Sequence, residues 1–475
     1  FPNFALYTKK NAMKNNIQED LKLFNYLATF FLKDEVNNPI SKYIDPKHVE
    51  RALEFKLEEE GITFKGLRKS LEKLLHESPK SSSKLFFNQL FGGRHSKAVL
   101  GDLLAVMLNN SMATYKIAGP QVNIEKEVLF QVYKLIGYGK TAGGTFPTGG
   151  SMSNFMSLVI ARDKIDPKAK DKGGSKKLVA YTSENSHYSI SKNASLSGIG
   201  RENVRYIRSD QYGRLDVLAF VNQVKLDKSN GLIPFYLNAT AGTTVLGAFD
   251  NVSNLAPICK QNNIWLHLDG AFGGSVIFSE KYKHLVNGIH LTDSFCFNAH
   301  KTLGAPLSTS VLAVRNKEDL YNSFNNDAEY LYQTHNEEFN LGRTSFECGR
   351  RNNALKLWTM WKSIGRKGIS NIVDREFKLA DAARNYIKTN SNYTLYSFEE
   401  SLSVCFNYKN LDPVDLCSKL YKRNKLMVGF GNFKNKVFIR LVLVNFENST
   451  SDVINFFAIL EEFADKNLAN IKKLN

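Results

Sequence analysis

The sequence FNAHKTLG at residues 297–304 decides the fold of this 475-residue chain. It places Lys301, preceded by His300, directly after a short apolar run and just before a glycine. A lysine amine at the end of a buried strand can form a Schiff base with an aldehyde cofactor. The chain has 63 lysines and arginines, most of them expected in solvent, so this stretch needs support from a second one.

An acid ends the second apolar run, LHLDGAFGG at residues 266–274. The alternative for Asp269 is a solvated acid in a turn, which the apolar flank IWLHL at residues 264–268 disfavours. A desolvated carboxylate is costly unless it meets a positive group, and a protonated pyridine nitrogen is such a group. A lysine Schiff base with an acid facing a pyridinium is the protein side of pyridoxal 5′-phosphate (PLP) chemistry.

Short apolar runs alternate with helical patterns between about residues 105 and 360. We expect strands at residues 178–181, 204–207, 235–237, 264–268 and 294–297, and helices from residue 187 and at 216–224 and 254–260. This alternation predicts an α/β fold with a mostly parallel sheet that is covered on both faces. Ligands bind such sheets at the carboxyl ends of the strands, where Asp269 and Lys301 fall. We predict an N-terminal helical segment at 1–104, a large domain at 105–362 and a small α+β domain at 363–475.

Composition limits the other classes of protein. No apolar run of about 18 residues predicts a membrane helix, so we expect no membrane partner. Five cysteines without CxxC spacing argue against a disulfide framework or a metal site, and predict a cytoplasmic protein. The net charge of +17 is compatible with attraction of an acidic substrate. Because lysine is spread along the whole chain and no nucleic-acid motif is present, we expect no nucleic-acid partner. No charged-then-apolar signal opens the chain, and the start at Phe1 leaves the natural N-terminus undefined.

Three further stretches offer contacts for a cofactor. GGTFPTGGSMSN at residues 143–154 runs into a helical pattern, and is either a phosphate seat at a helix N-terminus or an ordinary capped turn. SENSHYS at 183–189 carries His187, which either lies on an aromatic ring or bonds locally. NATAGTT at 238–244 ends a strand with hydroxyls that hold a ring or make a turn.

Together these stretches resemble the group II PLP-dependent amino-acid decarboxylases of PLP fold type I, the aspartate-aminotransferase-like fold. FFNQL at 86–90, TYKIA at 114–118 and CGR at 348–350 extend the resemblance from about residue 86 to the C-terminus. Within the group, the chain looks most like the glutamate, cysteine sulfinate and aspartate decarboxylase branch. The resemblance implies PLP as cofactor, a small acidic amino acid as substrate, and a homodimer with the active site at its interface.

The resemblance also implies a role for each matching position. Lys301 holds the cofactor aldehyde, Asp269 pairs with the pyridine nitrogen, and His187 stacks on the ring. Tyr330, in AEYLYQ at 328–333, corresponds to the mobile-loop tyrosine that reprotonates the substrate carbon, and Arg440 to the arginine that holds the α-carboxylate. The remaining implied cofactor contacts are Gly150, Ser151, Met152, Ser153, Thr244, Ala271, Asn298 and His300, and the implied substrate contacts are Gln89, Leu90 and Phe91.

Three positions depart from the pattern of the family or of its glutamate branch. Ala299 stands where the family has proline and Gly270 where it has alanine, and neither change removes a reacting group. Phe91 stands where the glutamate enzymes carry a small polar residue, which favours the cysteine sulfinate type. The rival interpretation is another fold type I enzyme, either a decarboxylase of a non-acidic amino acid or an aminotransferase or lyase. The sequence leaves open which acidic amino acid is used and how activity is regulated.

Overall fold

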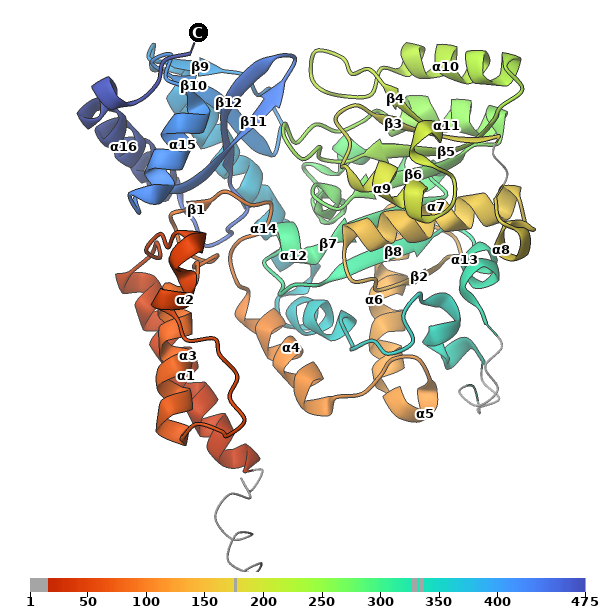
Figure 1. Cartoon of the computed structure of the whole chain (residues 1–475). Coiled ribbons are helices and arrows are strands. Elements are labelled where there is room, and N and C mark those ends of the chain that lie inside the picture. The colour runs from red at the N-terminus through yellow and green to blue at the C-terminus, as the bar shows by residue number, and fades with distance from the viewer. Residues whose placement is uncertain (1–15, 175–176, 327–331, 333–336, 475) are drawn as a thin grey trace, which may run out of the picture.

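Two β-sheets organise the chain, and the computed structural model describes residues 16–174, 177–326, 332 and 337–474 (Figure 1). The large sheet has the strand order β2-β8-β7-β6-β5-β3-β4. Its central strands pair in parallel, whereas β8 runs antiparallel to both β7 and β2. The strands are β2 (Gly143–Thr145), β3 (Leu178–Ser183), β4 (Val204–Ile207), β5 (Ile233–Thr240), β6 (Trp265–Gly270), β7 (Ser294–Asn298) and β8 (Ser310–Val314). The predicted α/β fold with a mostly parallel sheet is confirmed.

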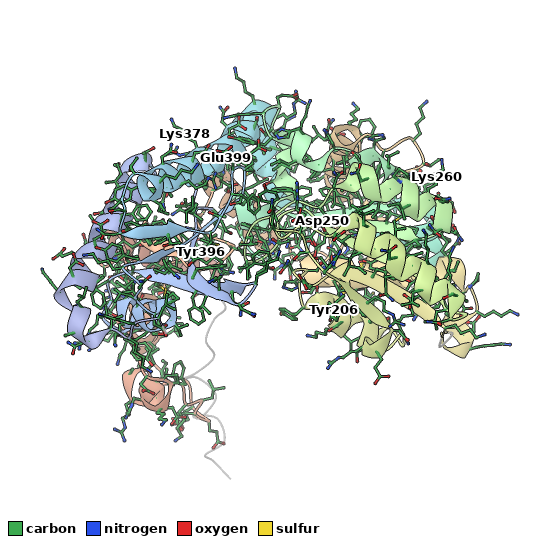
Figure 2. The ribbon with its side chains drawn as sticks, turned by 90° about the horizontal axis from the view of Figure 1, so that it is seen from above. Tyr206, Asp250, Lys260, Lys378, Tyr396 and Glu399 are labelled. Atoms are coloured by element: carbon green, nitrogen blue, oxygen red, sulfur yellow. The ribbon has the colours of Figure 1, made fainter. Side chains whose placement is uncertain are left out.

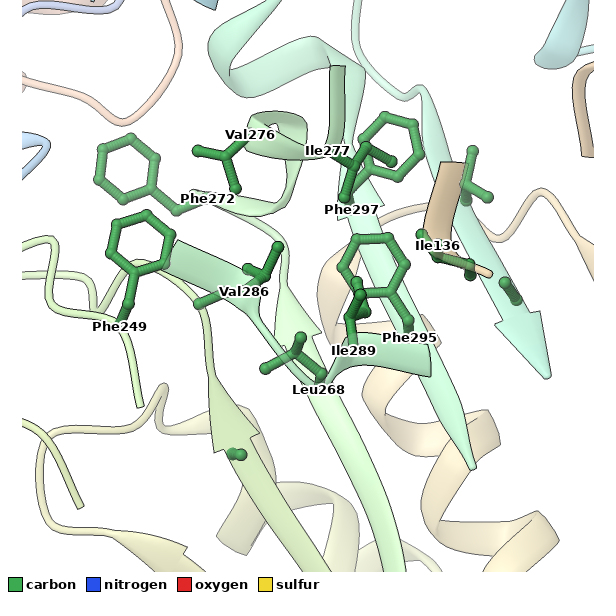
Figure 3. Packing of buried hydrophobic residues seen from close by; sticks show 14 of the residues in the cluster. Ile136, Phe249, Leu268, Phe272, Val276, Ile277, Val286, Ile289, Phe295 and Phe297 are labelled. Atoms are coloured by element: carbon green, nitrogen blue, oxygen red, sulfur yellow. The ribbon is translucent and has the colours of Figure 1, made fainter. Parts of the chain in front are cut away.

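Helices cover both faces of the large sheet, which explains why its strands are apolar along their whole length. Side chains of successive strand residues alternate between two hydrophobic cores: Leu266 and Leu268 lie in one, and Trp265 lies in the other. Figure 3 shows the first core, where Phe295 and Phe297 pack near Leu268. The helices of this part are α5 (Tyr115–Ala118), α6 (Gln121–Ile136), α7 (Gly150–Ile165), α8 (Ala169–Lys172), α9 (Ser189–Leu196), α10 (Val217–Ser229), α11 (Val252–Asn262), α12 (Ala299–Thr302) and α13 (Lys317–Phe324).

The small sheet has the order β1-β11-β12-β10-β9 and forms a second lobe beside the large sheet (Figures 1 and 2). Figure 2 labels Tyr396 in this lobe and Asp250 in the large one. The elements are β9 (Tyr393–Leu395), β10 (Ser403–Tyr408), α15 (Pro413–Lys422), β11 (Met427–Phe433), β12 (Lys436–Val442) and α16 (Thr450–Lys466). The edge strand β1 (Phe86–Phe87) comes from the N-terminal segment and pairs in parallel with β11.

Long helices join these parts. At the N-terminal end, α1 (Ile17–Asn37) packs against α3 (Phe64–Glu77), with α2 (Val49–Ala52) between them in the chain, and the group extends away from the large sheet (Figure 1). Next, α4 (Ser96–Leu108) packs against α14 (Ala354–Lys388), which is interrupted at Gly365, where φ is 66°. The predicted domain boundaries at 104/105 and 362/363 fall inside α4 and α14, and they stay a prediction.

Short 3₁₀ helices complete the described chain: η1 (Pro46–His48), η2 (Arg201–Asn203), η3 (Gly274–Phe278), η4 (Lys283–Val286), η5 (Ile289–Leu291), η6 (Glu337–Phe339), η7 (Leu341–Thr344) and η8 (Leu468–Asn470). None of the helices in the described residues is long and apolar enough to cross a membrane.

Candidate active site

The carboxyl ends of the parallel strands enclose a cavity of about 220 Å³. Because neighbouring parallel strands end at the same edge of a sheet, residues far apart in the sequence meet there. The lining residues are Gly150, Ser151, Asn154, His187, Tyr188, Thr240, Gly242, Thr244, Asp269, Ala271, Phe272, Asn298, His300 and Lys301. The structure therefore brings together every predicted cofactor contact except Met152 and Ser153.

Lys301 reaches this cavity from α12, which begins directly after β7. Burial lowers the pKa of its amine, although the nearby charge of Asp269 acts in the opposite direction. Among the described residues, no hydrogen bond or ion pair holds this amine. A lowered pKa increases the fraction of neutral amine, which is the form that attacks a carbonyl carbon.

His300 is buried beside Lys301, and its Nδ1 faces the backbone of Thr309. This nitrogen lies 2.9 Å from Thr309 N and 3.1 Å from Thr309 O, so it accepts from the first or donates to the second according to the tautomer of the ring. Burial, reinforced by the charge of Lys301, lowers the pKa of His300 to about 4. The cavity wall thus contains a neutral imidazole.

Asp269, the last polar residue of β6, is only 3% exposed and is held by two N–H donors, with the Cys296 thiol 3.7 Å from its Oδ1. Asn154 Nδ2 donates to its Oδ2 at 2.7 Å, and the backbone N–H of Ala271 donates to Oδ1 at 3.0 Å. Hydrogen bonds to the charged form favour a carboxylate in a buried site. Asn154 belongs to the glycine-rich stretch and lies 115 residues from Asp269 in the sequence, so no local pattern predicts this contact.

His187 lies in the turn between β3 and α9. Its Nδ1 accepts a local hydrogen bond from the backbone N–H of Ser189 at 3.2 Å, and its ring also lines the cavity. The ring of Tyr188 lies 4.3 Å from it, centroid to centroid. Burial lowers the pKa of His187, so a neutral, flat ring faces the cavity.

The glycine-rich stretch starts α7 at the cavity and needs glycine at Gly150. A Cβ atom there would lie 2.8 Å from the Cβ of Ala271 and 3.1 Å from Nδ2 of Asn298. The Ser153 side chain points behind this turn, where its hydroxyl contacts Gly149 O at 3.2 Å and Ser310 Oγ at 3.0 Å. Met152 packs on the second hydrophobic core, so neither side chain lines the cavity.

A buried acid outside the cavity supports the NATAGTT stretch. Asp250, labelled in Figure 2, accepts backbone hydrogen bonds from Thr240 and Leu215, both at 2.7 Å. Burial raises the pKa of Asp250 to about 6, against the lowering effect of these two bonds. The hydrogen bonds attach the end of β5 to the following loop, which positions Thr240 and Thr244 at the cavity.

The predicted substrate residues occupy different places. Arg440 on β12 donates from Nη1 to Thr244 O at 3.1 Å and from Nη2 to Asn88 O at 2.9 Å, so it adjoins the cavity. Gln89 is exposed, whereas Leu90 and Phe91 are half-buried. None of the three lines the cavity of the single chain. Tyr330 lies outside the described residues.

A larger cavity of about 660 Å³ lies elsewhere on the large sheet. It is lined by residues such as Trp265, Asp293 and Arg315, and by none of the predicted site residues. Since reactive groups decide the location of chemistry more than volume does, the smaller cavity is the candidate active site.

The residues of the smaller cavity fit PLP. They offer an amine for the aldehyde, a carboxylate held by two N–H donors for a pyridinium, and a flat neutral ring. They also offer, for an anionic group, a helix start that a side chain at Gly150 would obstruct.

Comparison with known proteins gave matches over most of the chain. A family model described as the pyridoxal-dependent decarboxylase conserved domain matches residues 46–409. Cysteine sulfinic acid decarboxylase of Rattus norvegicus is 33% identical over 431 residues, which cover 86% of this chain and 87% of the relative. Acidic amino acid decarboxylase GADL1 of Homo sapiens is 32% identical over 443 residues, which cover 88% and 85%.

Solved structures agree with the fold described above. The crystal structure of mouse CSAD superposes with a TM-score of 0.89 at 30% identity, covering 94% of this chain and 99% of that one. Oryza sativa TDC with PLP and tryptamine superposes with a TM-score of 0.88 at 20% identity, covering 97% and 99%. The second likeness is one of fold.

Proposed function

Because this chain belongs to the pyridoxal-dependent decarboxylase family, we propose that it decarboxylates a small acidic L-amino acid to the corresponding amine. The enzyme class, a PLP-dependent amino-acid decarboxylase, follows from the family. The acidic substrate is the step we add, with cysteine sulfinate, aspartate and glutamate as candidates. It is supported by relatives named as cysteine sulfinic acid and acidic amino acid decarboxylases at 33% and 32% identity.

One observation carries the proposed chemistry: Lys301, Asp269 and His300 line a single cavity, which Arg440 adjoins through Thr244. When bound, PLP supplies an electron sink for the pair of electrons that the departing carboxylate leaves behind. Lys301 would hold the cofactor through its aldehyde. Asp269 keeps a proton on the pyridine nitrogen, which strengthens the sink.

The other lining residues position the cofactor in this proposal. The His300 imidazole and the backbone N–H groups around Ser151 would hold the phosphate at the start of α7, where the helix dipole favours an anion. His187 and Ala271 enclose the ring. Asn298 and Thr244 complete the shell, together with the backbone of Met152 and Ser153.

Two residues act on the substrate. Arg440 binds the α-carboxylate, for which a guanidinium is suited by its paired donors. By holding this carboxylate, Arg440 would fix the orientation of the bond that breaks. Tyr330 then delivers a proton to the α-carbon, which yields the amine rather than a transamination product.

Substrate choice within the acidic branch is assigned to the segment Gln89–Phe91. An aromatic side chain at Phe91 favours cysteine sulfinate over glutamate, since it leaves less room for a longer side chain. Gln89 joins Arg440 at the α-carboxylate in this proposal. The backbone of Asn88, one residue away, already bonds to Arg440 at 2.9 Å.

We further propose a homodimer with the active site at its interface. The helix α4, which follows the Gln89–Phe91 segment, exposes a row of apolar side chains to solvent in the single chain: Leu100, Leu104, Met107 and Leu108 are 46%, 46%, 54% and 48% exposed. A contiguous apolar patch on a helix marks a surface that another protein covers. The oligomeric state is measured by size-exclusion chromatography with light scattering. A protein that is monomeric at all concentrations and still fully active would contradict the dimer.

The proposed location is the cytoplasm. All five cysteines are free, and four of them are buried. Free thiols are typical of proteins from a reducing compartment.

In the experiment, purified protein supplemented with PLP is incubated separately with aspartate, cysteine sulfinate, cysteate and glutamate. Carbon dioxide and amine are both measured, with Lys301→Ala as the control for background release. Turnover of at least one acidic substrate is expected. A yellow cofactor band without any release would move the substrate outside the acidic branch, or the reaction to that of an aminotransferase or lyase.

A further inference from the structure

A chain of buried hydrogen bonds leads from Trp265 to Asp269. Trp265 Nε1 donates to Ser294 Oγ at 2.8 Å, and Ser294 Oγ lies 2.8 Å from His267 Nδ1. His267 Nε2 lies 3.0 Å from Asn154 Oδ1, and Asn154 Nδ2 donates to Asp269 Oδ2 at 2.7 Å. All five side chains are at most 6% exposed.

The alternation of side chains along a strand explains how these hydrogen-bonded residues come together. Side chains two residues apart on a strand point to the same face, so Trp265, His267 and Asp269 share one face of β6. Ser294 on β7 is the register partner of His267. The helix α7 packs on these strands and brings Asn154 between His267 and Asp269.

The groups at the two ends of this series of hydrogen bonds determine the direction of donation along it. An indole N–H can only donate, and an ionised carboxylate can only accept. The Ser294 hydroxyl therefore donates to His267 Nδ1, and the neutral His267 carries its proton on Nε2, from which it donates to Asn154. Burial lowers the pKa of His267 to about 4, which agrees with a neutral ring. Every N–H and O–H donor of this series consequently points its positive end toward Asp269.

Donors aligned in this way stabilise a negative charge on Asp269, the acid in the cavity. Asp269 is the only acidic side chain among the residues that line the cavity. In a buried site, aligned hydrogen bonds polarise one another and stabilise the charge at the end that accepts them. Hydrogen-bond partners at both ring nitrogens, Ser294 Oγ at Nδ1 and Asn154 Oδ1 at Nε2, fix the orientation of the His267 imidazole.

We propose that His267 and Asn154 are positioning residues that keep Asp269 ionised and aimed at the pyridine nitrogen of the cofactor. The inference rests on the proposed role of Asp269. His267 touches neither cofactor nor substrate: it acts through Asn154. The protonation of the ring nitrogen is thus set by a network that extends across two strands and a helix.

The test measures the ring nitrogen directly. Holoenzyme is reconstituted with PLP labelled with ¹⁵N in the ring, and the ¹⁵N chemical shift reports whether that nitrogen is protonated. His267→Leu and Asn154→Leu are expected to shift the signal toward the unprotonated form and to weaken PLP binding about tenfold or more, equivalent to about 1.4 kcal/mol. His267→Gln, which retains a side-chain N–H, should recover part of the signal.

Ser157→Ala is the matched control. The Ser157 hydroxyl is also fully buried and lies 2.9 Å from Ser294 Oγ, but it stands beside the path to Asp269. Its removal should leave the ring signal unchanged. Should the leucine variants fail to fold, Trp265→Phe removes the donor at the far end, and it should move the signal in the same direction by a smaller amount.

A further variant separates this inference from the proposed role of Asp269. If Asp269→Ala leaves the ¹⁵N signal unchanged, the assignment of Asp269 itself is wrong. If Asp269→Ala shifts the signal but the His267 and Asn154 variants behave as Ser157→Ala does, the network is structural and the inference is overturned.

Discussion

The buried ion pair between Arg350 and Glu125 predicts that Arg350→Met lowers the stability of the folded chain by about 3–5 kcal/mol. Arg350 Nη1 and Nη2 donate to Glu125 Oε2 and Oε1, both at 2.7 Å. The two side chains are 3% and 1% exposed. Removal of the guanidinium would leave the carboxylate without water and without its partner, which is the costly way to break a buried pair.

This free energy converts into a modest change in Tm. An unfolding entropy of roughly 2.1 cal/mol/K per residue amounts to about 1 kcal/mol/K for 475 residues. The expected fall in Tm is therefore about 3–5 °C, measured by calorimetry. Arg350 does not line the cavity, so the PLP content of the folded variant should equal that of the parent.

The matched control is an exposed pair, Lys466 and Glu462, whose side chains are 71% and 65% exposed. Lys466→Met should change Tm by less than about 1 °C, because exposed pairs contribute little. The double variant Arg350→Met with Glu125→Met should recover most of the loss, since an apolar pair of similar volume needs no counter-charge. Equal falls in Tm for Arg350→Met and Lys466→Met would refute the reasoning.

Three further predictions concern the active site. Lys301→Ala should still bind PLP, measured by equilibrium dialysis, but should lose turnover; retained turnover would contradict its role. Tyr330→Phe should slow decarboxylation and divert substrate to transamination, visible as a carbonyl product, whereas an unchanged amine yield would exclude Tyr330 as the proton donor. His300 has a folded pKa of about 4 against about 6.5 when unfolded, so the unfolded apoprotein binds more protons between these values, and stability is lost as the pH falls through that window. In His300→Gln, the slope of the unfolding free energy against pH, measured by urea unfolding, should be smaller by the equivalent of about one proton. An unchanged slope would show that His300 does not contribute to it.

The amino-acid sequence by itself determined the class of fold, and it predicted the reactive groups. Apolar runs that end in Asp269 and Lys301 are local patterns, and parallel strands necessarily bring their carboxyl ends to one edge. The same local logic predicted the turn at Gly150. The structure then added the reason for glycine there, which is the 2.8 Å approach of Ala271.

Only the tertiary structure decided which distant groups meet. Nothing local in the sequence indicates that Asn154 reaches Asp269 across 115 residues, or that Arg440 bonds to Asn88 across 352. Nor does it predict that residues 86–87 form an edge strand of the C-terminal sheet. Hydrophobic periodicity reports whether a side chain is buried, whereas the identity of its partner depends on strand register and helix packing, which the whole chain determines.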